Sequence, residues 1–86
     1  MPEISRFFGI VIKMYFDDHN PPHFHAKYAN YKASICIKDF KILEGFLHPK
    51  THSLVIEWAS IHQKELLANW EKLQKSNAFE KIKPLE

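Results

Sequence analysis

A period of two governs the first half of the chain, and a helical period governs the second. Residues 7–16 and 23–28 are rich in β-branched and aromatic side chains, and residues 31–38 alternate between apolar and polar positions. Both patterns are typical of strands that bury one face. A fourth, weaker strand is expected over residues 41–47.

The connections between these strands carry turn residues. Pro21 and Pro22 follow the first strand, and consecutive prolines remove backbone donors and stop regular structure. Residues 29–30 and 39–40 are expected to form tight turns. The strands are therefore expected to pair antiparallel with their neighbours in sequence.

From about residue 53 to residue 75, apolar positions recur at steps of three and four, which predicts one long helix. Pro49 stands just before this helix, and Thr51 or Ser53 can cap its first turn. The tail over residues 77–86 is expected to be loose. The expected buried face of the helix consists of Val55, Trp58, Ala59, His62, Leu66, Trp70 and Leu73.

Strands followed by a helix predict an α+β fold in a single domain over residues 1–86. The expected architecture is a small antiparallel sheet of about four strands, within residues 7–47, packed by one long C-terminal helix. The large rings of Trp58 and Trp70 are expected to provide much of the contact between helix and sheet.

The length and composition of the chain exclude several classes of function. The chain has 86 residues, of which 45% are hydrophobic and 14% aromatic, so it is expected to fold as a globular domain. It is too short for a dinucleotide-binding fold with a substrate domain or for a TIM barrel. No apolar run is long enough to span a membrane. A formal net charge of +2 does not by itself indicate nucleic-acid binding.

Two features favour a cytoplasmic location. Cys36 is the single cysteine and cannot form an internal disulfide, which is usual in a reducing compartment. The N-terminal residues lack the basic and apolar pattern of a secretory signal.

Histidines concentrate around the double proline. Three of the six histidines in the chain, His19, His23 and His25, lie within seven positions, and Asp18 stands beside them. Because side chains alternate along a strand, His23 and His25 point to the same side. A carboxylate near an imidazole fixes its tautomer and raises its pKa.

One interpretation is proton-transfer chemistry on RNA. A metal-independent ribonuclease needs a base for the 2′-hydroxyl, an acid for the leaving oxygen and a cation for the phosphate. His23, His25 and Lys27 offer these three group types on one strand face, and His19 can take either proton role. The alternative to a catalytic site is that these residues form an ordinary solvent-exposed face of the sheet.

A second interpretation is a catalytic zinc or manganese ion, which needs a third ligand beside His23 and His25. His62 is the candidate, and a three-histidine set would be similar to a catalytic zinc site. However, the apolar face of the second predicted strand is the face that should meet the helix. His23 and His25 would then lie on the opposite side of the sheet from His62, which favours a core role for His62.

The sequence resembles a family of small bacterial domains of unknown function. The most specific stretch is Asp-His-Asn-Pro-Pro-His-Phe-His over residues 18–25. The strand over residues 4–16 and the helix pattern with Trp58, His62 and Trp70 extend the resemblance to about residue 75.

The resemblance implies a place in a toxin–antitoxin gene pair. This chain would be the toxin-like half, and its partner would be a small antitoxin-like protein that covers the motif. The expected target is RNA or the translation machinery. The alternatives are a non-enzymatic partner- or DNA-binding module of the same pair, with homodimerisation through an exposed strand edge, or a metal-dependent hydrolase.

Overall fold

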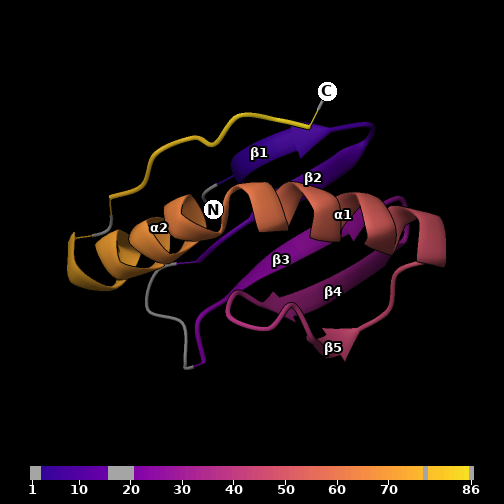
Figure 1. The fold of residues 1–86 in the computed structure, drawn as a ribbon, viewed down its shortest axis with the longest axis horizontal. Helices are drawn as coiled ribbons and strands as arrows, with labels where there is room; N and C mark the ends of the chain where they lie inside the picture. Colours follow the sequence, from indigo (N-terminus) through magenta and orange to yellow (C-terminus); the bar gives the residue numbers. More distant parts are fainter. Residues whose placement is uncertain (1–2, 16–20, 77, 86) are drawn as a thin grey trace.

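The chain forms a five-stranded antiparallel sheet with two helices, an α+β fold (Figure 1). The computed structural model describes residues 3–15, 21–76 and 78–85. The strands lie in sequence order β1-β2-β3-β4-β5. The elements are β1 (Glu3–Phe7), β2 (Ile10–Lys13), β3 (His23–Tyr28), β4 (Tyr31–Cys36), β5 (Ile42–Gly45), α1 (Pro49–Ile61) and α2 (Gln63–Ser76).

The first predicted strand is in fact two strands. Phe8 and Gly9 have φ angles of 49° and 79° and form a two-residue turn between β1 and β2. Phe8 occupies a position where Asn is usual, so only Gly9 interrupts the pattern of β-branched and aromatic residues at this turn. The sheet therefore has five strands rather than four, and it begins at Glu3.

The helical region is also divided. The expected single helix over residues 53–75 begins four residues earlier, at Pro49, and breaks at His62, whose φ and ψ of −113° and 24° are not helical. The apolar spacing continues across the break, so the sequence pattern does not reveal it. Thr51 and Ser53 do not cap the helix: the N-cap is His48, which makes no side-chain cap bond, and Pro49 takes the first helical position.

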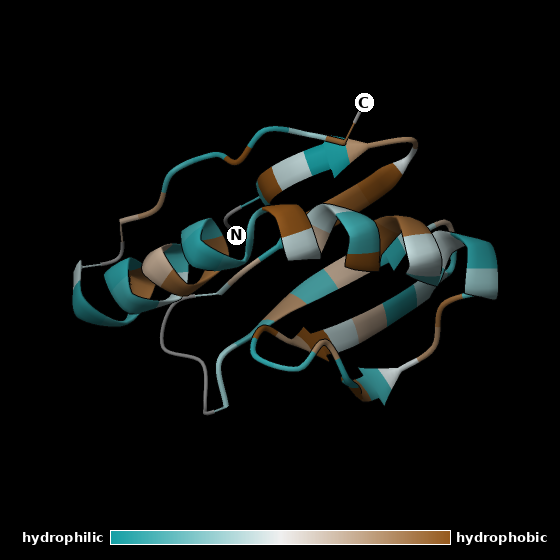
Figure 2. Ribbon diagram, in the orientation of Figure 1, coloured by the Kyte–Doolittle hydropathy of each residue, from teal (hydrophilic) through white to brown (hydrophobic). Residues whose placement is uncertain are grey.

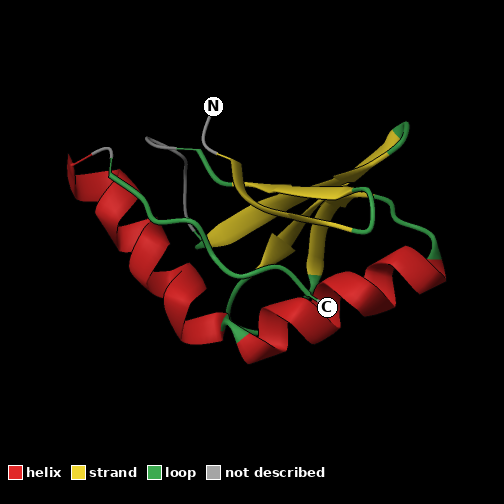
Figure 3. Ribbon diagram, turned by 90° about the horizontal axis from the view of Figure 1, so that it is seen from above, coloured by secondary structure: helices red, strands yellow, loops and turns green. Residues whose placement is uncertain are grey.

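The two helices meet the sheet differently. α1 lies across one face of the sheet, whereas α2 bends away and rises beside one end of it (Figure 3). Trp58 of α1 is fully buried and packs on the rings of Phe7 and Phe24, with centroids 5.4 and 6.0 Å apart, which confirms its expected contact with the sheet. Trp70 of α2 packs on the ring of His23, the first residue of β3, so it also makes its expected contact with the sheet.

Apolar and polar residues alternate along β3 and β4 (Figure 2), as the period of two predicts. The turn over residues 29–30 is also confirmed, since Tyr28 and Tyr31 are register partners. Within this turn, Ala29 has a positive φ of 54°.

The C-terminal segment was expected to be loose, but residues 78–85 are anchored. The Ile82 amide donates to the Ile4 carbonyl at 2.8 Å, and Ile82 is buried. Asn69 of α2 donates to the Glu80 carbonyl and accepts from the Glu80 amide, at 2.7 and 2.9 Å. This segment runs along β1 (Figure 1) and so covers one edge of the sheet.

None of the helices in the described part of the chain is long and apolar enough to cross a membrane.

Candidate active site

The face of the sheet opposite α1, which we call the open face, carries the polar side chains of the central strands. The strand register places His25 between Lys13 of β2 and Ser34 of β4. Two residues further along β3, Lys27 lies between Val11 and Lys32. Because side chains alternate along each strand, these residues of three strands form two adjacent rows on one surface, one through His25 and one through Lys27.

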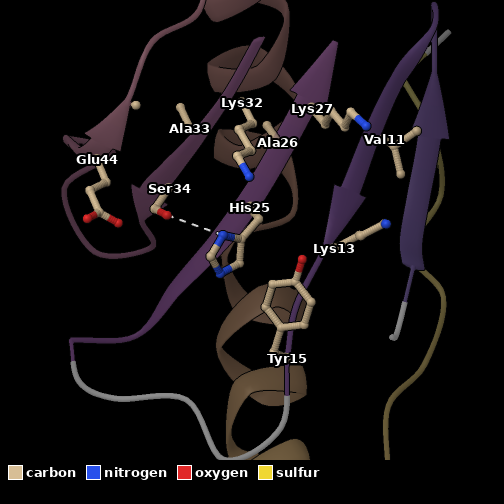
Figure 4. Close-up of a pocket in the computed structure, with 11 residues that line it drawn as sticks. Val11, Lys13, Tyr15, His25, Ala26, Lys27, Lys32, Ala33, Ser34 and Glu44 are labelled. Atoms are coloured by element: carbon tan, nitrogen blue, oxygen red, sulfur yellow. Dashed lines mark hydrogen bonds between the residues drawn. The ribbon is translucent and has the colours of Figure 1, made fainter. Parts of the chain in front are cut away.

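A hollow of about 660 Å³ lies on this face (Figure 4), and we call it the histidine hollow. Four strands, β2 to β5, contribute lining residues, and the segment after β2 contributes Tyr15. Its polar lining side chains are Lys13, Tyr15, His25, Lys27, Lys32, Ser34 and Glu44.

His25 is held from two sides within this hollow. Its Nδ1 lies 3.2 Å from the Ser34 hydroxyl oxygen, and the Tyr15 ring meets the imidazole edge to face with centroids 4.6 Å apart. His25 is half-buried, so it keeps some contact with solvent while its ring orientation is constrained. That combination suits a group that exchanges protons with a bound ligand.

His23 lies deeper than His25. Its exposed fraction is 3%, and its ring packs on His25 at 5.1 Å and on Trp70 at 5.2 Å. Its Nδ1 donates to the Pro21 carbonyl at 2.7 Å, which places a proton on that nitrogen. Tyr15, His25, His23 and Trp70 thus form a continuous series of ring contacts, the ring chain, from the hollow to α2.

Positive charge dominates the histidine hollow. Among the described residues that line it, Lys13, Lys27 and Lys32 are cations and Glu44 is the single carboxylate. The nearby Arg6 is engaged elsewhere: it forms a two-pronged hydrogen bond with Glu3 at 2.8 and 3.2 Å, which lowers the pKa of the Glu3 carboxyl. The lysines therefore supply the charge that an anionic ligand in the hollow would meet.

The structure brings some of the predicted site residues together and not others. His25 and Lys27 line the histidine hollow, and His23 supports His25 from behind. The predicted residues Asp18 and His19 lie outside the described residues. Cys36 is buried and is the register partner of His23.

The proposed metal ligands do not form one group. Across residues 3–15, 21–76 and 78–85, no set of three or more His, Cys, Asp or Glu side chains is placed to hold a metal ion. His62 lies at the junction of the helices, where its Nδ1 is 2.7 Å from Glu65 Oε1 and its ring packs on Trp58 at 5.6 Å. These contacts agree with a structural role for His62.

Sequence reasoning missed Lys13, Tyr15 and Ser34 as site residues. Lys13 and Tyr15 alternate with the buried Ile12 and Met14, so their common side was readable from the period of two. The sequence did not predict the strand register, which places Lys13 and Ser34 on either side of His25. Register depends on turn geometry and on contacts across the sheet.

One comparison with known proteins identifies a relative. A family model described as a domain of unknown function (DUF4160) matches residues 9–71, which include every residue that lines the histidine hollow. No curated protein and no solved structure matches the chain.

Proposed function

This chain belongs to the DUF4160 family, whose function is unknown, and we propose that it is a metal-independent ribonuclease, the toxin-like half of a toxin–antitoxin pair. One observation carries the proposal: a histidine held in a fixed orientation, a tyrosine and three lysines line one hollow on the open face. Lysine cations suit a phosphate, and an imidazole suits proton transfer.

The reaction that this arrangement supports is attack by a ribose 2′-hydroxyl on the adjacent phosphate. His25 accepts the 2′-hydroxyl proton while the bond from that oxygen to phosphorus forms. The bond from phosphorus to the 5′-oxygen breaks, and the Tyr15 hydroxyl donates a proton to that oxygen. The products are a 2′,3′-cyclic phosphate and a free 5′-hydroxyl, so atoms and charge balance. Lys13, Lys27 and Lys32 stabilise the phosphorane charge.

His23 takes a different part in this proposal from the one that the sequence suggested. Its burial and its bond to the Pro21 carbonyl favour a positioning role, in which it holds the His25 ring against rotation. His19 and Asp18 remain predicted proton-transfer groups of the loop before β3.

The test is cleavage of a fluorophore- and quencher-labelled oligoribonucleotide in excess EDTA. We expect cleavage by the wild type, a product with a cyclic phosphate end, and no cleavage of the matching oligodeoxyribonucleotide. His25→Gln should lower the rate by about 100-fold or more. His48→Gln is the matched control, because His48 is an exposed histidine outside the histidine hollow.

Three outcomes would contradict the proposal. Equal rates for wild type and His25→Gln would remove His25 from the chemistry. Loss of cleavage in EDTA, with recovery on adding zinc or manganese, would favour the metal-dependent hydrolase. Tight RNA or DNA binding without any cleavage would favour the binding module.

The cellular part of the proposal rests on the resemblance to toxin-like domains. Induced expression of the wild type should arrest growth, and His25→Gln should abolish the arrest. Co-expression of the neighbouring gene should restore growth. Arrest that persists in a folded His25→Gln variant would separate toxicity from the histidine hollow.

A further inference from the structure

The end of the sheet farthest from His23 carries four exposed aromatic side chains, which we call the aromatic row. Phe8, Tyr28, Tyr31 and Phe46 have exposed fractions of 57%, 40%, 41% and 53%. They are contiguous: the Tyr28 ring lies against Gly9, next to Phe8, Tyr28 and Tyr31 are register partners, and the Tyr31 and Phe46 centroids are 5.9 Å apart. Contiguous exposed apolar surface is typical of interaction sites.

Phe8 adopts a backbone conformation that phenylalanine disfavours. Its φ of 49° lies in the left-handed region, where a side chain with a Cβ is strained. It stands at the first position of a two-residue hairpin loop with positive φ at both residues, where Asn before Gly is favoured. The Phe8 ring meets the Phe7 ring edge to face, with centroids 6.3 Å apart, but it stays 57% exposed, so this contact offsets little of the strain.

A second hollow, of about 420 Å³, lies between this turn and the start of α1. We call it the turn hollow. Phe8, Ile10, Tyr28 and Leu54 give it apolar walls, together with Thr51, and Lys50 is the single charged side chain among the described residues that line it. An occupant that matches this lining has an apolar side chain for the hollow and a negative charge for Lys50.

We propose that the turn hollow and the aromatic row dock a short acidic–apolar segment of another protein. One aromatic or leucine side chain of that segment inserts between Phe8 and Tyr28, and an adjacent carboxylate pairs with Lys50. Aromatic side chains commonly carry the binding energy at such surfaces. A single cation amid aromatic walls fits an acidic peptide better than a nucleic acid, whose binding needs many phosphate contacts. This inference does not depend on the proposed ribonuclease activity.

The experiment selects binders from a random-peptide phage library on the full chain, followed by affinity measurement with the synthesised winning peptides. Enriched peptides should share one large apolar residue beside Asp or Glu. Phe8→Asn should weaken their binding by roughly tenfold or more. The same variant should raise the melting temperature by roughly 4 °C, because it removes the strained residue. Weaker binding by a more stable protein cannot be attributed to unfolding.

Two further variants control the interpretation. Ala29→Gly relieves a positive φ of 54° in the neighbouring turn but removes no aromatic ring, so it should raise the melting temperature and leave peptide affinity unchanged. Lys50→Glu changes an exposed residue in the first turn of α1, where an acidic side chain is compatible with the helix. Selection on Lys50→Glu should enrich Lys or Arg in place of Asp or Glu.

Several results would overturn the inference. One is the absence of peptides that distinguish the wild type from Phe8→Asn. Another is a concentration-dependent dimer that Phe8→Asn dissociates, which would make a second copy of this chain the occupant. Loss of oligoribonucleotide binding in Phe8→Asn would instead assign the aromatic row to RNA.

Discussion

The two ends of β3 use aromatic rings in opposite ways. At the first end, His23 is 3% exposed, and Trp70 and His25 pack on its ring. At the other end, Tyr28 is 40% exposed and belongs to the aromatic row, which α1 leaves partly exposed. The difference comes from the helices: the break at His62 turns α2 toward the His23 end, whereas α1 only begins at the Tyr28 end.

This contrast indicates that the two ends of β3 have different functions. A group that transfers protons must be held in one orientation, and the ring chain supplies that constraint from behind. A docking surface gains its free energy by losing water when a partner arrives, so its rings must be wet beforehand. Burial therefore favours chemistry at the histidine hollow, and exposure favours recognition at the turn hollow.

The largest expected effect is on stability at the buried end. Trp70→Ala should lower the free energy of unfolding by about 3–5 kcal/mol, because a large ring 5% exposed leaves a cavity. Phe46→Ala, at the exposed end, should change it by no more than about 0.5 kcal/mol. Urea denaturation of both variants measures this difference. Equal losses would abolish the contrast between the two ends.

A smaller effect is expected within the histidine hollow. Ser34→Ala removes the hydroxyl that lies 3.2 Å from His25 Nδ1, so the imidazole loses part of its orientation. Cleavage of the labelled oligoribonucleotide should slow by about tenfold, less than for His25→Gln. Its pH profile should keep its shape, since the proton-transfer groups remain. An unchanged rate would show that Ser34 does not position His25.

At the aromatic end the sign of the stability change should reverse. Phe8→Asn and Ala29→Gly should each raise the free energy of unfolding by about 1 kcal/mol, because both residues now hold positive φ angles. Thermal denaturation at a fixed protein concentration measures this gain. A loss of stability in Phe8→Asn would mean that the exposed ring packs favourably, and it would weaken the argument that this ring serves docking.

The smallest expected effect concerns the lysines. Lys32→Ala should weaken binding of a single-stranded oligoribonucleotide to the His25→Gln variant by about threefold at low salt. It should also reduce the slope of log affinity against log salt by about 0.7, the value of one phosphate contact. Lys38→Ala, an exposed lysine outside the histidine hollow, is the control and should leave the slope unchanged.

Much of this arrangement could be predicted from alternation alone. The α+β class and the shared face of His23, His25 and Lys27 follow from the period of two, which holds wherever a strand forms. The sequence pattern did not predict the Phe8–Gly9 turn or the helix break at His62. In the turn only Gly9 departs from the surrounding strand pattern, and at the break His62 continues the helical spacing of the buried positions.

By itself, the sequence determined which side chains share a face, because that depends only on spacing along each strand or helix. Only the tertiary structure decided which strands meet at His25, since the register of Lys13 and Ser34 depends on contacts across the sheet. It also decided that Trp70 covers His23 while Phe8 stays exposed. A helix break and a turn direct those rings, and their geometry is set by packing between residues far apart in the chain.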